Sequence, residues 1–208
     1  MPLTAFALNC SLKASGASAK SSTDRMIADL FATLAAYGVT GSVERAADYD
    51  IRPGVSSDEG KGDEWPKLRE RVLEADIFVL GAPIWLGQPS SIAKRVVERM
   101  DAFLSETDEA GRMPPAGKVA IVAVVGNEDG AHHCHAAMFQ ALNDVGFTIP
   151  ANAGVYWVGE AMGDADYVDL DTTPEPVKQT LETAAANAAH LARVLRQNPY
   201  CGTKAGGK

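Results

Sequence analysis

Short apolar runs and longer helical patterns alternate along the chain, and this alternation constrains the fold more than any other feature. Strand-like runs occupy 4–9, 39–46, 76–82, 118–125 and 154–158. Helix-like patterns occupy 22–37, 65–74, 90–104, 132–145 and 174–197. Strands that alternate with helices of this length favour a parallel sheet with helices on both faces. The sequence therefore predicts an α/β, doubly wound fold.

In a sheet of this kind, ligands bind outside the carboxyl ends of the strands, where the strand order reverses. The loops to inspect are therefore those after the first, third and fourth strands, at 11–21, 83–89 and 126–130.

The first loop is rich in serine and alanine, carries Lys13 and Lys20, and has no acidic residue before Asp24. Because a helix follows it directly, free amides, hydroxyl groups and the positive end of a helix dipole meet there. This combination indicates a phosphate site.

Two common phosphate loops are excluded by missing glycines. A Walker A loop needs glycine at 14 and 19, which are both alanine, and G-x-G-x-x-G fails because Gly16 is the only glycine between 4 and 38. A hydroxyl-rich loop with a lysine suits a terminal phosphate monoester, bound by Ser11, Ser22, Thr23 and Lys13. The alternative is an ordinary surface loop in which Ser22 or Thr23 caps the helix.

The second loop (GAPIWLGQP, 81–89) places two glycines, two prolines and Trp85 after a buried strand. Such residues let a backbone approach a flat ligand while the indole covers a ring. The third loop (GNEDG, 126–130) again pairs glycines at a strand end. Taken singly, Trp85 is a packing residue and 126–130 a tight turn; three such loops at the expected strand ends favour a ligand site.

These residues together resemble the flavodoxin-like, NAD(P)H-dependent FMN reductases. Segment 76–101 looks like the second flavin loop of that family with its following helix, and residues 9–13 with 22–23 are similar to its phosphate loop. Segments 126–130 and 155–159 resemble its third loop and closing strand, so the resemblance covers about 4–162. The T-x-T-G-x-T loop of flavodoxin proper is absent, and 48–63 holds no cysteine cluster of the iron–sulfur flavoproteins.

The resemblance implies a flavodoxin-like, five-stranded parallel sheet of order 2-1-3-4-5 that binds FMN. Hydride would pass from NADPH or NADH to the flavin, and electrons would then pass to a quinone, free flavin or similar small acceptor. The flavin does the chemistry, so we expect no catalytic side chain. The expected cofactor-binding residues are Ser11, Lys13, Ser22, Thr23, Pro83, Ile84, Trp85, Leu86, Gly87, Gly126, Asn127, Glu128, Asp129 and Gly130. The same loops would serve an FMN-binding electron carrier or redox sensor, which is the alternative function.

Other candidate chemistries are weaker. His132 and His135 share a helix face, but His133 and Cys134 point elsewhere, so we expect no metal site. Because they begin the helix after the third loop, one of these histidines is instead expected to lie near the flavin or the nicotinamide. Cys10 precedes the phosphate loop, where a helix N-terminus lowers a thiol pKa; the simpler interpretation is a small buried residue.

Composition bounds the remaining expectations. The 208 residues, 46% hydrophobic and 22% charged, suit one domain (1–198) with a flexible tail (199–208). A net charge of -8 argues against nucleic acid or an anionic membrane as a partner, and no apolar run is long enough to span a bilayer. Three cysteines without metal-type spacing favour the cytoplasm. The resemblance also implies a homodimer or homotetramer.

Overall fold

The computed structural model describes residues 2–18, 20–161 and 163–203. Five parallel strands form its sheet: β1 (Leu3–Asn9), β2 (Val39–Arg45), β3 (Ile77–Trp85), β5 (Val119–Gly126) and β6 (Gly154–Val158). Their order is β2-β1-β3-β5-β6, and the two-residue strand β4 (Gln88–Pro89) pairs with β3 in antiparallel fashion. The expected order 2-1-3-4-5 is confirmed, since only β4 shifts the numbering.

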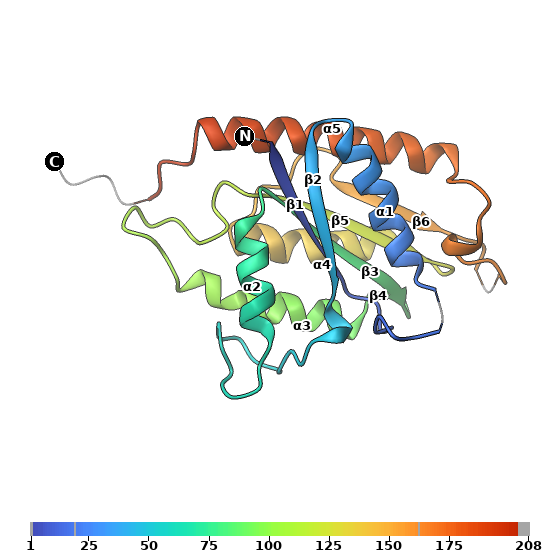
Figure 1. The fold of residues 1–208 in the computed structure, drawn as a ribbon, viewed down its shortest axis with the longest axis horizontal. Helices are drawn as coiled ribbons and strands as arrows, with labels where there is room; N and C mark the ends of the chain where they lie inside the picture. The colour runs from blue at the N-terminus through green and yellow to red at the C-terminus, as the bar shows by residue number, and fades with distance from the viewer. Residues whose placement is uncertain (1, 19, 162, 204–208) are drawn as a thin grey trace.

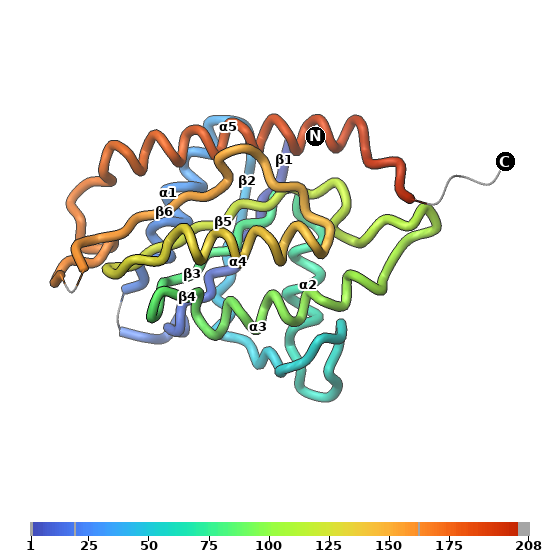
Figure 2. The backbone as a smooth tube through the Cα atoms, turned by 180° about the vertical axis from the view of Figure 1, so that it is seen from behind, coloured from blue at the N-terminus to red at the C-terminus, as the bar shows by residue number. Residues whose placement is uncertain are grey.

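Helices cover both faces of the sheet. Helices α1 (Ser22–Ala35) and α5 (Glu175–Gln197) pack on one face, where they share a core with β1, β3 and β5. Helices α2 (Trp65–Glu74), α3 (Ser91–Met100) and α4 (Ala131–Asp144) pack on the other. Figure 1 shows the long helix α5 on one side of the sheet and α3 on the opposite side. The view from behind shows α3 and α4 side by side (Figure 2).

Glycine lets α1 approach the sheet closely. A Cβ atom at Gly81 of β3 would lie 2.8 Å from Ile27 Cδ1 and 3.0 Å from Thr23 Cγ2. Real Cβ atoms essentially never approach another atom to 2.8 Å, so the first turn of α1 packs this closely over the end of β3 because residue 81 has no side chain. This places the phosphate loop directly above the central strands.

The polar excursion at 48–63 is held by a buried ion pair. The Arg99 guanidinium donates to both carboxylate oxygens of Asp63, at 2.9 and 2.6 Å, and to the carbonyl oxygens of Arg52 and Ser56. Both charged side chains are 0% exposed. Burial alone would raise the pKa of Asp63, but Arg99 and three backbone amides hold it well below its usual range.

Three short 3-10 turns follow strands or helices, at Ala46–Asp48, Asp101–Leu104 and Tyr167–Asp169. The helix expected at 90–104 is therefore α3 followed by a 3-10 turn. The strand expected at 76–82 extends to Trp85 because Pro83 pairs with β5 and residues 84–85 pair with β4.

The end of the chain makes a few specific contacts. The Thr203 amide donates to the Ala110 carbonyl at 3.0 Å, and the hydroxyl groups of Tyr200 and Thr148 lie 2.9 Å apart. Part of the tail expected at 199–208 lies outside the described residues, from 204 onward. The single domain at 1–198, the flexible tail and the cytoplasmic location stay predictions.

Candidate functional site

The loop between β1 and α1 delivers hydrogen-bond donors to one point. Ser21 caps α1, and its hydroxyl oxygen accepts from the Asp24 amide at 3.3 Å. The amides of Ser22 and Thr23 belong to the first turn, where they have no partner within the helix, and no other described residue accepts from them. The turn therefore presents two free amides and the positive end of the helix dipole.

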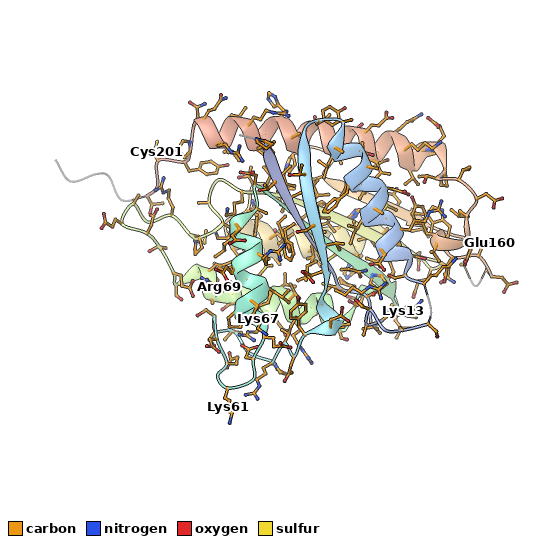
Figure 3. All side chains as sticks on the ribbon, viewed as in Figure 1. Lys13, Lys61, Lys67, Arg69, Glu160 and Cys201 are labelled. Carbon is orange, nitrogen blue, oxygen red and sulfur yellow. The ribbon has the colours of Figure 1, made fainter. Side chains whose placement is uncertain are left out.

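Two polar side chains of this loop lie beside those amides. Lys13 Nζ donates to the Lys20 carbonyl oxygen at 2.7 Å, so the ammonium group reaches across the loop (Figure 3). Ser11 is 4% exposed, and its hydroxyl donates to the Lys13 carbonyl at 3.4 Å. A bond this long is weak, so the hydroxyl can turn to an incoming acceptor at little cost.

Residues from β2 and from the turn that follows it anchor this loop. Arg45 donates to the Ala14 carbonyl at 2.8 Å and forms an ion pair with Asp24. Asp48 accepts hydrogen bonds from the Ser15 hydroxyl and from the Ser15 amide, the latter at 2.7 Å. Both bonds hold the pKa of Asp48 below its usual range. These contacts fix the loop to β2 and to the 3-10 turn that follows it.

The second loop is the hairpin that joins β3 to β4. Leu86 and Gly87 both adopt left-handed backbone conformations, with φ of 53° and 71°. Two consecutive residues with positive φ make the tight turn that matches the twist of paired strands. The turn leaves Ile84 buried and raises Trp85 and Leu86 into solvent, at 53% and 92% exposed.

Glu128 of the third loop holds the second loop in place by hydrogen bonds. Its Oε1 accepts from the Leu86 amide at 3.0 Å and its Oε2 from the Gly87 amide at 3.1 Å. The two loops also touch by backbone, since a Cβ atom at Gly130 would lie 2.8 Å from Gly87 Cα. The carboxylate expected to contact a cofactor therefore points into the neighbouring turn.

A fourth wall comes from the chain after β6. The rings of Trp157 and Tyr167 lie 5.5 Å apart, and the Tyr167 hydroxyl donates to Asp29 of α1 at 2.6 Å. Arg25 donates to the Tyr167 carbonyl at 2.8 Å, and the Val168 amide donates to the Ser22 hydroxyl at 3.2 Å. This segment is thereby fastened to the first turns of α1.

These elements enclose a cavity of about 160 Å³. Of the expected residues, it brings together Ser11, Lys13, Ser22, Thr23, Pro83, Ile84, Trp85, Gly126 and Asn127. The expected residues that do not line it are Leu86, Gly87, Glu128, Asp129 and Gly130. Sequence reasoning missed five lining residues: Leu12, Ser21, Val125, Trp157 and Asp166.

The cavity has two chemically different ends. Lys13, the free amides of α1 and the serine hydroxyl groups gather at one end, whereas Trp85, Trp157 and the aliphatic side chains of β3 and β5 supply flat, apolar surface. These features suit a molecule with a phosphate monoester at one end and a flat ring system at the other, which is the form of FMN.

The histidines of α4 lie apart from this cavity. His135 is 7% exposed and contacts Tyr156, with the ring centroids 5.6 Å apart. Burial lowers the pKa of His135 to about 4, although the Val155 backbone favours the charged form. Within the described residues, no group of three His, Cys, Asp or Glu side chains is arranged for a metal ion. None of these histidines lines the cavity.

The cysteines at the site are buried thiols. Cys10 is 0% exposed, and burial raises its pKa far above the usual range, so the simpler of its two interpretations is confirmed. Burial and the nearby Glu128 carboxylate raise the pKa of Cys134 to about 11. Neither thiol is a nucleophile at neutral pH.

The sheet order and the cavity at the strand ends define a flavodoxin-like protein. More narrowly, the chain belongs to the NADPH-dependent FMN reductase family, whose sequence model matches residues 4–163. The resemblance inferred from the loops is confirmed.

Named relatives refine this picture. The chain is 31% identical over 96% of its length to the 8-demethyl-8-aminoriboflavin-5′-phosphate synthase of Streptomyces davaonensis, and it covers 81% of that protein. A solved structure of RosB with bound 8-demethyl-8-formylriboflavin-5′-phosphate superposes with a TM-score of 0.86 at 31% identity, over 96% of this chain and 82% of that one.

The chain is also 38% identical, over 93% of its length, to a protein of Mycobacterium bovis described as the divalent metal cation transporter MntH. It spans only 29% of that protein's length. Among the described residues, no helix is long and apolar enough to cross a membrane.

Proposed function

We propose that the protein is an FMN-dependent oxidoreductase that takes hydride from NADPH or NADH and passes electrons to a small acceptor such as a quinone or free flavin. The observation that carries this proposal is the continuity of the cavity, which joins Lys13 and the first turn of α1 to Trp85 and Trp157. Family membership supports the same chemistry.

At the phosphate end, the chain supplies donors in three forms. The Ser22 and Thr23 amides point their N–H groups at the anion, the Ser11 hydroxyl adds a neutral donor, and Lys13 adds a charge. Hydrogen bonds to a charged acceptor are the stronger kind, about 1.5–3 kcal/mol each. This end of the cavity therefore supplies the hydrogen bonds that hold the phosphate.

At the ring end, the chain orients the cofactor and excludes water. When bound, FMN supplies the two-electron chemistry, and the protein supplies position and electrostatics. Ile84 and Val125 are buried beneath the cavity, while Trp85 and Trp157 close its sides. Among the described residues that line the cavity, the ionisable groups are Lys13 and Asp166.

The test uses purified protein loaded with FMN under anaerobic conditions. Addition of NADPH or NADH should bleach the flavin band, and a quinone should then restore it. A loaded protein that keeps its colour with both donors would favour the electron carrier. A protein that fails to take up FMN would refute both functions.

The 31% identical relatives favour a second candidate, in which FMN is the substrate. Their names describe riboflavin 5′-phosphate with an amino or formyl group in place of the 8-methyl group. The same phosphate loop and ring walls would hold FMN for such chemistry. Mass spectrometry of the flavin recovered after incubation separates the two candidates: an unchanged FMN mass supports the oxidoreductase, and a changed 8-substituent supports flavin modification.

A homodimer or homotetramer also belongs to this proposal. Leu86, 92% exposed beside the half-exposed Trp85, supports a contact between copies, because a large apolar side chain at a loop tip gains by burial. Sedimentation of the FMN-loaded protein measures the number of chains.

A further inference from the structure

A second cavity lies beside the first and is lined by residues of α3 and α4. Its volume of about 660 Å³ falls within the range of small-molecule sites, roughly 300–1,000 Å³. Leu12 and Trp85 line both cavities, and these side chains are 52% and 53% exposed. These two half-exposed side chains therefore form the boundary between the two cavities, and a ligand in the groove would extend to the edge of the first cavity.

The lining of the groove has the chemistry of a nucleotide site. Val97, Met138 and Ala141 supply apolar surface for a heterocycle, and Gln88 and Ser91 supply an amide and a hydroxyl group. The described residues that line it include one cation, Lys94, and no carboxylate. Acidic residues outnumber basic ones 27 to 19 in the whole chain. The lining of this groove is therefore more basic than the composition of the protein as a whole.

Lys94 is available to a ligand. Its side chain is 70% exposed, and its ion pair is with Glu98, one turn along the same helix at 3.5 Å. Exposed pairs of this kind contribute little to stability, so an incoming phosphate replaces the carboxylate easily. Arg95 of the same helix is engaged elsewhere, since it donates to the Ile51 carbonyl at 3.2 Å.

We propose that this groove binds the adenosine half of NADPH, with Lys94 paired to its 2′-phosphate. The inference rests on the proposed function, because the nicotinamide half would then lie over the first cavity, across Trp85. NADH lacks the 2′-phosphate, so Lys94 would make the protein prefer NADPH.

The test measures binding of adenosine 2′,5′-bisphosphate to the FMN-loaded protein by calorimetry, because this probe carries the phosphate but no hydride. Lys94→Gln should weaken its binding roughly tenfold to a hundredfold, the effect of losing one charge-assisted bond, and leave binding of adenosine 5′-monophosphate unchanged. Lys67→Gln is the matched control, since Lys67 is 68% exposed, pairs with Glu64 one turn away, and lies far from Lys13 (Figure 3). Equal probe binding by the Lys94 and Lys67 variants would overturn the proposal.

A blocking variant tests the groove itself. Ala137 lines it and is exposed, whereas the neighbouring Ala136 is exposed but does not line it. Ala137→Trp should abolish probe binding and raise the KM for NADPH, while Ala136→Trp should change neither. If Ala137→Trp leaves probe binding intact but alters the sedimentation mass, the groove holds a second copy of the chain and the nucleotide assignment is wrong. Probe binding without flavin bleaching would refute the proposed function and leave the groove assignment standing.

Discussion

Removing the Glu128 carboxylate should loosen the second loop and weaken FMN binding. Glu128 accepts hydrogen bonds from the Leu86 and Gly87 amides, and these bonds hold the turn that carries Trp85. In Glu128→Ala both amides lose their acceptor. Because Glu128 does not line the cavity, any effect on FMN passes through the turn.

The size of the effect follows from where the two amides lie. A hydrogen bond to a charged group contributes about 1.5–3 kcal/mol, so two would contribute about 3–6 kcal/mol if both amides stayed unpaired. Leu86 is 92% exposed, however, and water replaces the carboxylate there. The net cost is therefore one bond, about 1.5–3 kcal/mol, which corresponds to a Kd for FMN about tenfold to a hundredfold higher.

Flavin fluorescence titration measures this Kd. Glu128→Gln keeps one acceptor oxygen but turns an amide donor toward the other N–H group, so its Kd should lie between those of the wild type and Glu128→Ala. Glu182→Ala, an exposed residue of α5, is the control. The reasoning fails if Glu128→Ala binds FMN as tightly as the wild type does.

Three further predictions concern affinity and stability. Lys13→Ala should weaken FMN retention, measured by dialysis, more than it slows hydride transfer in the loaded protein; the reverse result would mean that Lys13 acts on the ring and not on the phosphate. Arg99→Leu should lower the free energy of unfolding in urea by about 3–5 kcal/mol by leaving Asp63 buried and unpaired, and adding Asp63→Leu should recover much of the loss. His135, whose pKa falls from 6.5 to about 4 on folding, stays neutral while the unfolded chain takes up a proton. Stability should therefore fall as the pH drops from 6.5 toward 4, by up to about 3 kcal/mol, and His135→Gln should lack this part of the loss in urea titrations at several pH values.

The part of the site that follows from strand order was predictable from the sequence. Alternating strands and helices bring the ends of β1, β3 and β5 to one edge, so Ser11, Pro83 and Gly126 had to lie close together. Local composition then identified the phosphate end, because hydroxyl groups and Lys13 precede a helix.

The remaining walls depend on tertiary contacts that leave no local signal. Trp157 and Asp166 reach the cavity only because Arg25 and Asp29 of α1 fasten the segment around Tyr167. The residues joined by these bonds are more than 130 positions apart in the sequence; Asp29 and Tyr167, for example, are separated by 138. No periodicity or motif reports such pairs.

The hairpin within the second loop was not predicted, for a related reason. A two-residue hairpin turn is usually recognised in a sequence by the dipeptide Asn-Gly or Asp-Gly. Here Leu86 occupies the first position with a left-handed backbone conformation. The turn is held in place by Glu128 from a different loop, so neither β4 nor the direction of that carboxylate could be inferred from 83–89 alone.

The most direct test of the account compares the affinities of the protein for FMN and for riboflavin, which differ only by the phosphate. If Lys13 and the first turn of α1 bind that phosphate, removing it costs at least two charge-assisted hydrogen bonds, about 3–6 kcal/mol, and the Kd of riboflavin should exceed that of FMN by a factor of about 10²–10⁴. Equal affinities for the two flavins would contradict the phosphate site on which the whole account is built.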